Sequence, residues 1–212
     1  MDSSKLMLSI HISLFILVIN LCTVPMLGSC FDRIINFGDS ISDTGNAYLS
    51  SGNASTSIGA LPYGMTYFKH PTGRWTNGRV ILDFVADHFN LPFVQPSVGG
   101  KTPEYFQKGV NFAVGGAGVL NNSVFTRMSG INPAQADNSL WVQLQSFNKL
   151  LPLIANGSDV PTMMNKSLIF VGEIGGNDYN RGLASLVPLE KITTWVPRVV
   201  SAIGSAVNIL IK

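Results

Sequence analysis

The 212-residue chain is 46% apolar and only 12% charged, with a formal net charge of +2. This composition fits one globular domain with a sizeable core and excludes a disordered or fibrous chain. Its 14 Lys and Arg residues are scattered, without a basic run or a basic amphipathic helix. The charge pattern therefore argues against a nucleic-acid partner.

Residues 1–30 have the pattern of a signal peptide. Lys5 precedes an apolar stretch over residues 6–24, and small residues follow it. We expect cleavage just before Phe31, with residues 31–212 as the mature domain. An uncleaved membrane anchor is the alternative, because about 20 apolar residues span a bilayer. Polar residues within the stretch count against an anchor, so we expect no stable membrane span after signal removal.

Cysteines and glycosylation motifs fit a secreted protein. Cys22 and Cys30 both lie within or at the edge of the signal segment, so the mature domain is expected to have no disulfide. Four N-x-[ST] motifs, which accept glycans on exposed loops of secreted proteins, follow in the mature part. These glycosylation candidates are Asn53, Asn121, Asn156 and Asn165.

Three apolar strands alternate with helical patterns along the chain. The predicted strands cover 33–37, 109–114 and 167–174. The predicted helices cover 79–90, 139–154 and 189–211, with Pro197 kinking or restarting the last one. A long loop rich in Gly, Ser, Pro and Asn covers 47–77.

The apolar spacing also predicts the buried face of each helix. In the helix over 79–90, Asn77 is the expected cap, and Asp83 and Asp87 are expected on the solvent side. The apolar residues expected inside are Val80, Ile81, Phe84, Val85 and Phe89, then Trp141, Leu144, Phe147, Leu150 and Leu151, then Ile192, Val196, Val199, Ile203 and Val207.

This order of elements predicts an α/β protein with a parallel sheet and helices on both faces. In such sheets ligands bind beyond the carboxyl ends of the strands. A Gly-rich segment follows each predicted strand, at Gly38, at 115–118 and at 175–176. The segment at 115–118 lacks the spacing of a nucleotide-binding loop. We therefore expect the functional site at this edge of the sheet, without a nucleotide.

Ser40 is the candidate nucleophile, because it follows a strand through a glycine turn that exposes its hydroxyl. A serine needs a base to become nucleophilic, and its attack on an ester builds negative charge on the carbonyl oxygen. Backbone N–H groups in glycine turns and side-chain amides are suitable donors to that oxygen. Gly116 and Asn177 follow the neighbouring strands, although Asn177 as a simple cap fits equally well. Asp178 is expected to orient local backbone.

Three motif blocks, in order and spacing, resemble the plant GDSL esterase/lipase family of the SGNH hydrolase group. They are Gly38-Asp39-Ser40 within the block from Phe37 to Asn46, Asn111-Phe112-Ala113-Val114-Gly115-Gly116-Ala117, and Gly175-Gly176-Asn177-Asp178. The stretch Pro71-Thr72-Gly73-Arg74-Trp75-Thr76-Asn77-Gly78-Arg79 resembles members similar to acetylajmalan and sinapine esterases. The resemblance covers nearly all of residues 31–212.

The resemblance implies a flavodoxin-like three-layer fold and a serine carboxylic ester hydrolase. Ser40 is the implied nucleophile, and the N–H groups of Ser40 and Gly116 with the side chain of Asn177 form the implied oxyanion hole. The implied partner is a small-molecule or lipid ester, with no cofactor and no metal. Arg74 and Trp75 are candidates for a substrate rim or for loop anchors.

The family's catalytic Asp and His come from a late Asp-x-x-His block, which this sequence does not contain. Neither His70 nor His88 has an Asp three residues before it. We therefore expect the amino-terminal portion of such a fold, with its carboxyl-terminal part missing, the strand around 168–171 near an exposed edge, and impaired catalysis. The alternatives are a noncatalytic truncated product or binding or decoy protein, and an acyltransferase that uses the same serine.

Overall fold

The structure is a computed structural model that describes residues 30–52 and 57–211. The chain divides into two units, Met1–Cys30 and Phe31–Lys212, and the second is described here. The predicted signal peptide lies outside the described residues, apart from the exposed free cysteine Cys30. No helix of the described part is long and apolar enough to cross a membrane.

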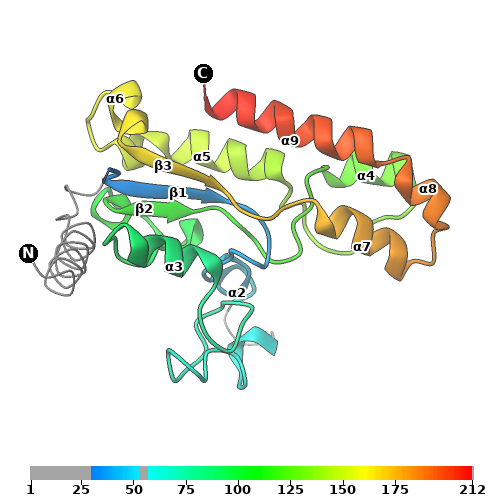
Figure 1. Cartoon of the computed structure of the whole chain (residues 1–212), viewed down its shortest axis with the longest axis horizontal. Helices are drawn as coiled ribbons and strands as arrows, with labels where there is room; N and C mark the ends of the chain where they lie inside the picture. Colours follow the sequence, from blue (N-terminus) through cyan, green and yellow to red (C-terminus); the bar gives the residue numbers. More distant parts are fainter. Residues whose placement is uncertain (1–29, 53–56, 212) are drawn as a thin grey trace, which may run out of the picture. The chain divides into compact units, whose positions relative to one another are not determined.

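A parallel sheet of three strands forms the centre of the described unit (Figure 1). Strand β1 (Arg33–Phe37) lies between β2 (Gly109–Asn111) and β3 (Ser167–Val171). In the register, Ile35 is opposite Val110 on one side and Ile169 on the other. The three predicted strands and their parallel arrangement are thus confirmed, and β3 is an edge strand of the described sheet.

The second and third strands are shorter than predicted at their carboxyl ends. Beyond β2, the Phe112 N–H still donates to the Asn36 carbonyl at 2.8 Å. Beyond β3, the Gly172 N–H donates to the Phe37 carbonyl at 2.8 Å. A second bond follows on each side, from the Val114 N–H to the Gly38 carbonyl at 3.3 Å and from the Asp39 N–H to the Glu173 carbonyl at 3.2 Å. Both segments therefore follow the central chain past the ends of their strands before they turn into the loops that carry the second and third motif blocks.

Helices occupy about half of the remaining described chain. The three predicted helices are confirmed within two residues at most boundaries, and the last is broken into α8 and α9, with Pro197 in the first turn of α9. Helices α2, α4, α6 and α7 and three short 3₁₀ turns are absent from the predictions. The bounds are α2 Asn46–Ser50, η1 Ser57–Gly59, α3 Ile81–His88, η2 Ser97–Gly99, η3 Glu104–Phe106, α4 Asn122–Ser129, α5 Leu140–Ala155, α6 Val160–Asn165, α7 Gly176–Ala184, α8 Leu189–Thr193 and α9 Val196–Leu210.

Side chains that alternate along β1 assign helices to the two faces of the sheet. Ile34 packs in a cluster with Leu82 and Ala86 of α3. Ile35 and Phe37 belong to the larger cluster, which α5 and α9 cover. Figure 1 shows α3 on one side of the sheet and α5 and α9 on the other. This arrangement confirms the three-layer α/β fold expected for an SGNH hydrolase.

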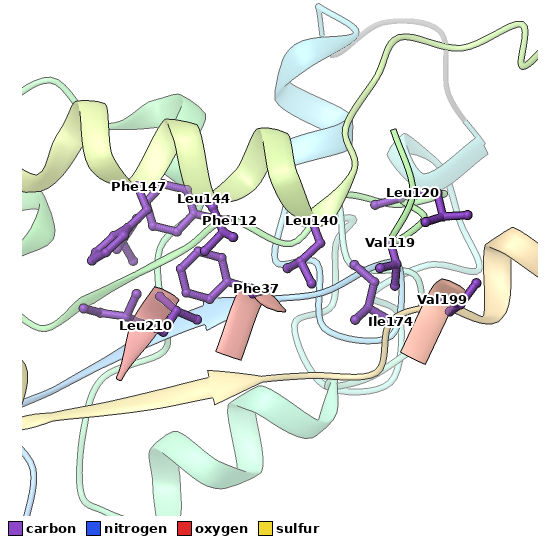
Figure 2. Close-up of a cluster of buried hydrophobic side chains, with 14 of the residues drawn as sticks. Phe37, Phe112, Val119, Leu120, Leu140, Leu144, Phe147, Ile174, Val199 and Leu210 are labelled. Carbon is purple, nitrogen blue, oxygen red and sulfur yellow. The ribbon is translucent and has the colours of Figure 1, made fainter. Parts of the chain in front are cut away.

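Three phenylalanine rings anchor the larger cluster beneath α5 (Figure 2). Phe37 stacks on Phe112 with 5.3 Å between ring centroids, and the Phe147 ring meets both edge-on at 5.7 and 5.8 Å. Such aromatic pairs add to the free energy gained from apolar burial. The cluster fixes α5 over the carboxyl end of β1, where the site is built.

The predicted buried face of α3 is correct only in part. Val80 is buried, and Val85 and Phe89 pack against the cluster that contains Ile34, as predicted. Ile81 and Phe84 are 57% and 52% exposed, whereas Asp83 is fully buried. The Asp83 carboxylate accepts hydrogen bonds from the Arg74 guanidinium at 2.8 and 2.9 Å and from the Val80 N–H at 3.0 Å. Val80, not Asn77, is therefore the cap position of α3. The Phe84 ring instead lies under an arginine guanidinium at the surface.

Most predicted core positions of the later helices are confirmed. The buried ones are Leu144, Phe147, Ile192 and Val199, and Leu150, Leu151 and Ile203 pack against the same cluster. Trp141 of α5 and Val196 and Val207 of α9 are exposed, contrary to the predictions, and Ala206 and Leu210 are buried in α9 as well. Apolar spacing missed these positions because each helix carries apolar residues on more than one face.

Breaking the buried ion pair is expected to destabilise the fold. Asp83→Asn should lower the free energy of unfolding by about 3 kcal/mol, because it leaves the buried Arg74 guanidinium without its carboxylate. Asp87→Asn, in the same helix, removes an exposed pair with Arg79 and should cost less than about 1 kcal/mol. Urea unfolding of both variants measures the difference, and equal losses would contradict this account of α3.

Candidate functional site

Ser40 lies in the turn that follows the central strand β1, and it is half-buried. The preceding Gly38 is held from both sides by Gln143 of α5, which accepts from the Gly38 N–H at 3.0 Å and donates to its carbonyl at 2.8 Å. A side chain at Gly38 would collide with the Ser42 hydroxyl. The turn therefore needs glycine there, and α5 fixes where Ser40 begins.

Two aspartates shape the backbone on either side of Ser40. The Asp39 carboxylate accepts from the Ile41 N–H at 3.0 Å, and the Asp39 carbonyl accepts from the Asp43 N–H at 2.9 Å. The fully buried Asp43 carboxylate accepts from the Asn46 N–H at 2.7 Å and from the Gly115 N–H at 2.8 Å. Asp43 thus ties the serine turn directly to the glycine turn of the second block.

Gly116 lies in a tight turn that places its N–H at the same edge of the sheet. The Ala117 N–H closes the turn on the Val114 carbonyl at 3.0 Å, and Gly116 has a φ of 80°, which favours glycine. Within the described chain, neither the Ser40 N–H nor the Gly116 N–H has a hydrogen-bond acceptor. Both donors are therefore available to a bound oxygen.

Asn177 links the first two blocks through its side-chain amide. Its Nδ2 donates to the Asp39 carboxylate at 3.1 Å and to the Ala117 carbonyl at 2.9 Å. The structure thus brings Asn177 against the neighbours of both Ser40 and Gly116. Because both amide hydrogens already have acceptors, a substrate oxygen at Asn177 must compete with one of them.

The Asp39 carboxyl is the strongly perturbed acid of the site. Burial, the adjacent Glu173 carboxyl and the charge of Asp178 raise its pKa to about 7, against the opposing hydrogen bond from the Ile41 N–H. Near neutral pH, Asp39 is therefore present in comparable amounts with and without its proton. Only the ionised form is a strong acceptor for the Asn177 amide.

Helix α7 carries the third block and holds the loop after Gly116. Its buried Asp178 carboxylate accepts from the Val119 N–H at 2.7 Å and from the Leu120 N–H at 3.1 Å. Burial raises the pKa of Asp178, and these backbone N–H groups act in the opposite direction. Asp178 therefore orients backbone, as predicted.

His70 and His88, the two histidines of the predicted mature domain, both lie away from the site. His70 is exposed, and its Nδ1 lies 3.0 Å from the Pro71 carbonyl. His88 ends α3 and packs edge-on against Phe89. In the described part of the chain, neither makes a hydrogen bond to Ser40. The described residues also contain no group of three His, Cys, Asp or Glu side chains able to hold a metal ion.

The two rim candidates have different positions. Arg74 is a loop anchor, since its guanidinium is buried against Asp83. Trp75 packs its indole on Gly115, where any side chain would collide with it, and part of the ring is exposed. Trp75 thus covers the glycine turn beside Gly116 and stays a candidate for the substrate rim.

Three residues that shape the site lie outside the three motif blocks and were not predicted. Gln143 contacts Gly38 across 105 residues of sequence, and Gln135 and Arg181 both donate to the Gly116 carbonyl. Gln143 lies on the buried side of α5. A polar residue on the apolar side of a predicted helix is a pattern that the sequence could have shown. Gln135 and Arg181 give no such signal.

Comparison with known proteins identifies the family. The model of the GDSL-like Lipase/Acylhydrolase family matches residues 34–211. The Arabidopsis thaliana proteins GDSL esterase/lipase At1g28570 and At1g28600 are 45% identical over 206 residues and 47% identical over 183 residues. These matches cover 94% and 85% of this chain but 52% and 46% of the relatives, so the chain spans about half their length. With a family match over residues 34–211, which include all three motif blocks, the chain belongs to the GDSL-like lipase/acylhydrolase family.

Proposed function

We propose that this chain carries the nucleophile and the oxyanion-binding groups of a carboxylic ester hydrolase that acts on lipid or specialised-metabolite esters. One observation carries the proposal. Ser40 lies at the carboxyl end of the central strand, with its own N–H and that of Gly116 both lacking acceptors in the described chain. Preorganised donors of this kind stabilise the charge that develops during acyl transfer.

In the proposed reaction, the Ser40 Oγ attacks the ester carbonyl carbon and gives its proton to a base. The carbonyl oxygen becomes an oxyanion and accepts hydrogen bonds from the N–H groups of Ser40 and Gly116 and from the Asn177 amide. Collapse of this intermediate expels the alcohol, which takes up the proton, and leaves an acyl-enzyme on Ser40. Water then attacks the acyl carbon, and the acid is released with Ser40 restored.

Among the described residues, no histidine is hydrogen-bonded to Ser40 to act as this base. The 212 residues contain no Asp-x-x-His block, and the described His70 and His88 contact no residue of the site. Oxyanion and binding groups alone retain roughly 10³- to 10⁴-fold catalysis over water when triad members are removed. We therefore propose impaired turnover for these 212 residues taken alone.

We also propose that the protein is secreted, with residues 1–30 as a signal peptide, and glycosylated. Asn156 ends α5 in a left-handed conformation and Asn165 ends α6, and both are exposed. Asn121 is partly buried and caps α4 by accepting from the Val124 N–H at 2.9 Å. Asn53 lies outside the described residues. Exposure therefore favours Asn156 and Asn165 as acceptors.

Ser40→Ala is expected to reduce p-nitrophenyl acetate hydrolysis about 10³-fold or more, because no nucleophile remains. The measurement uses a version of the protein completed with a carboxyl-terminal part. Ser51→Ala is the matched control, since that exposed hydroxyl bonds only to the Tyr48 carbonyl and its loss should leave turnover unchanged. Unchanged turnover in Ser40→Ala would refute the mechanism. No turnover by either protein would favour the noncatalytic alternative, and transfer of the acyl group to an added alcohol would favour the acyltransferase.

Asp39→Asn is expected to flatten the dependence of stability on pH. The folded protein keeps the Asp39 proton up to a pKa of about 7, whereas the unfolded chain loses it near pH 4. Folding therefore binds a proton between these values, and the free energy of unfolding falls as pH rises through this window. Urea unfolding at pH 4, 5, 6 and 7 should show a shallower fall in Asp39→Asn than in the wild type. Asp87→Asn should keep the wild-type slope, and parallel slopes for all three would contradict the raised pKa.

Asn156→Gln and Asn165→Gln should each remove one glycan from the secreted protein, because both side chains are exposed within acceptor motifs. The loss is measured as a decrease in intact mass that disappears after enzymatic deglycosylation. Asn132→Gln is the control, since that exposed residue lies outside any acceptor motif. An unchanged mass in both motif variants would count against entry into the secretory pathway.

A further inference from the structure

Two side chains far apart in the sequence hold the carbonyl of Gly116. Arg181 of α7 donates to it from Nη2 at 2.7 Å, and Gln135 donates from Nε2 at 3.0 Å. Hydrogen bonds from a guanidinium are stronger than those between neutral groups. The carbonyl therefore has one strong, charge-assisted donor and one weaker, neutral donor.

These contacts determine the direction of the Gly116 N–H. Glycine has more freedom in φ and ψ than any other residue, so a glycine turn alone does not fix its amide. On one side of Gly116, the Gly115 N–H is bonded to Asp43 at 2.8 Å, and on the other, the Gly116 carbonyl is bonded to Arg181. The peptide between these two anchors, which carries the Gly116 N–H, has little room to rotate.

One helix connects this anchor to the other side-chain donor of the site. Arg181 and Asn177 are four residues apart in α7 and therefore share a face. Asn177 donates to the Ala117 carbonyl at 2.9 Å, one residue after the carbonyl that Arg181 holds. The same helical face thus fixes consecutive carbonyls of the glycine turn.

The surroundings of Arg181 combine one packing contact with an unsatisfied polar atom. The guanidinium lies over the Phe125 ring, 5.6 Å from its centroid. The Nη1 atom of Arg181 is buried and has no hydrogen-bond partner in the described chain, which costs stability. No salt bridge from Arg181 to a carboxylate occurs among the described residues. A charge kept in such an environment is better explained by the carbonyl it holds than by the stability it adds.

We propose that Arg181 is a positioning residue for ester hydrolysis, which acts through the Gly116 carbonyl to aim the Gly116 N–H at the oxyanion, with Gln135 as the secondary donor. The inference rests on the proposed function. It predicts that Arg181 affects the transition state, where the oxyanion exists, more than the binding of the neutral ester.

An open pocket beside Arg181 makes the proposal testable by chemical rescue. The pocket has a volume of about 450 Å³ and is lined by Gln135, Arg181 and apolar residues that include Ile131 and Ala184. Truncation of the Arg181 side chain would extend this pocket toward the Gly116 carbonyl. A guanidinium ion added to the solution can then enter and donate to that carbonyl.

The first experiment compares Arg181→Ala, Arg181→Lys and Arg127→Ala in the same completed version of the protein, with p-nitrophenyl acetate as substrate. Arg181→Ala should lower kcat about 10- to 100-fold with KM nearly unchanged, which is less than the loss from deleting a donor. Guanidinium below denaturing concentrations should restore part of kcat, whereas the same concentration of sodium chloride should not. Lysine should retain intermediate activity. Arg127, an exposed arginine of α4, is the control and should leave kcat unchanged.

A wild-type kcat in Arg181→Ala overturns the proposal, and so does a loss of kcat that guanidinium does not restore. Failure of the proposed function is a different result, namely wild-type turnover that is absent or insensitive to Ser40→Ala.

The second experiment decides the positioning role without turnover, by amide hydrogen exchange. The Ala117 N–H, which closes the glycine turn, should exchange faster in Arg181→Ala than in the wild type or in Arg127→Ala. The Asn46 N–H is an internal control, because the Asp43 carboxylate holds it in every variant. Unchanged exchange at Ala117 would overturn the proposal even if the protein had no measurable turnover.

Discussion

The site depends on a network of buried amides at the carboxyl ends of β1 and β2. Asn36 donates to the Asn111 side chain at 2.6 Å, and Asn111 donates to the Ser42 carbonyl at 2.7 Å. Asn46 donates from its side chain to the Asn111 carbonyl at 2.7 Å and to the Ala113 carbonyl at 2.9 Å. An unpartnered amide group in such surroundings is costly, and of this network only the Asn36 Oδ1 is buried without a partner among the described residues, so these bonds support one another. The serine turn and the start of the glycine turn consequently have one arrangement relative to each other.

The charge distribution around the candidate site suits an oxyanion best when the Asp39 carboxyl is neutral. Burial raises the pKa of Asp39, Asp43 and Asp178, which all lie near the candidate donors. Asp43 and Asp178 direct their carboxylates to backbone N–H groups, so their charge is compensated locally. Asp39 also contacts the Asn177 amide, and its neutral form competes least for that amide and repels a developing negative charge least.

Much of the fold and the position of the candidate site could be predicted from the sequence. Short apolar runs ending in glycine identify β1, β2 and β3, and the carboxyl ends of neighbouring parallel strands meet at one edge. Those two facts suffice to expect Ser40, Gly116 and Asn177 near one another, and the structure connects their neighbours by hydrogen bonds.

What the sequence did not reveal depends on contacts between distant residues. Asp83 was expected in solvent because a carboxylate in an apolar helix looks like the polar face. Its burial requires Arg74, which comes from an irregular loop with no periodicity to interpret. Likewise, Gln143, Gln135 and Arg181 act on backbone groups 105, 19 and 65 residues away, and no local pattern records such pairs.

The same long-range contacts decide when during synthesis the turn around Ser40 can take its folded arrangement. Backbone carbonyls beside Ser40 accept from Asn111 and Gln143, and the Asp43 carboxylate accepts from the Gly115 N–H, so all three partners are synthesised after Ser40. A nascent chain that has exposed Ser40 but not Gln143 lacks the bonds that shape the serine turn. The arrangement of the serine turn seen in the folded domain therefore requires residues up to Gln143.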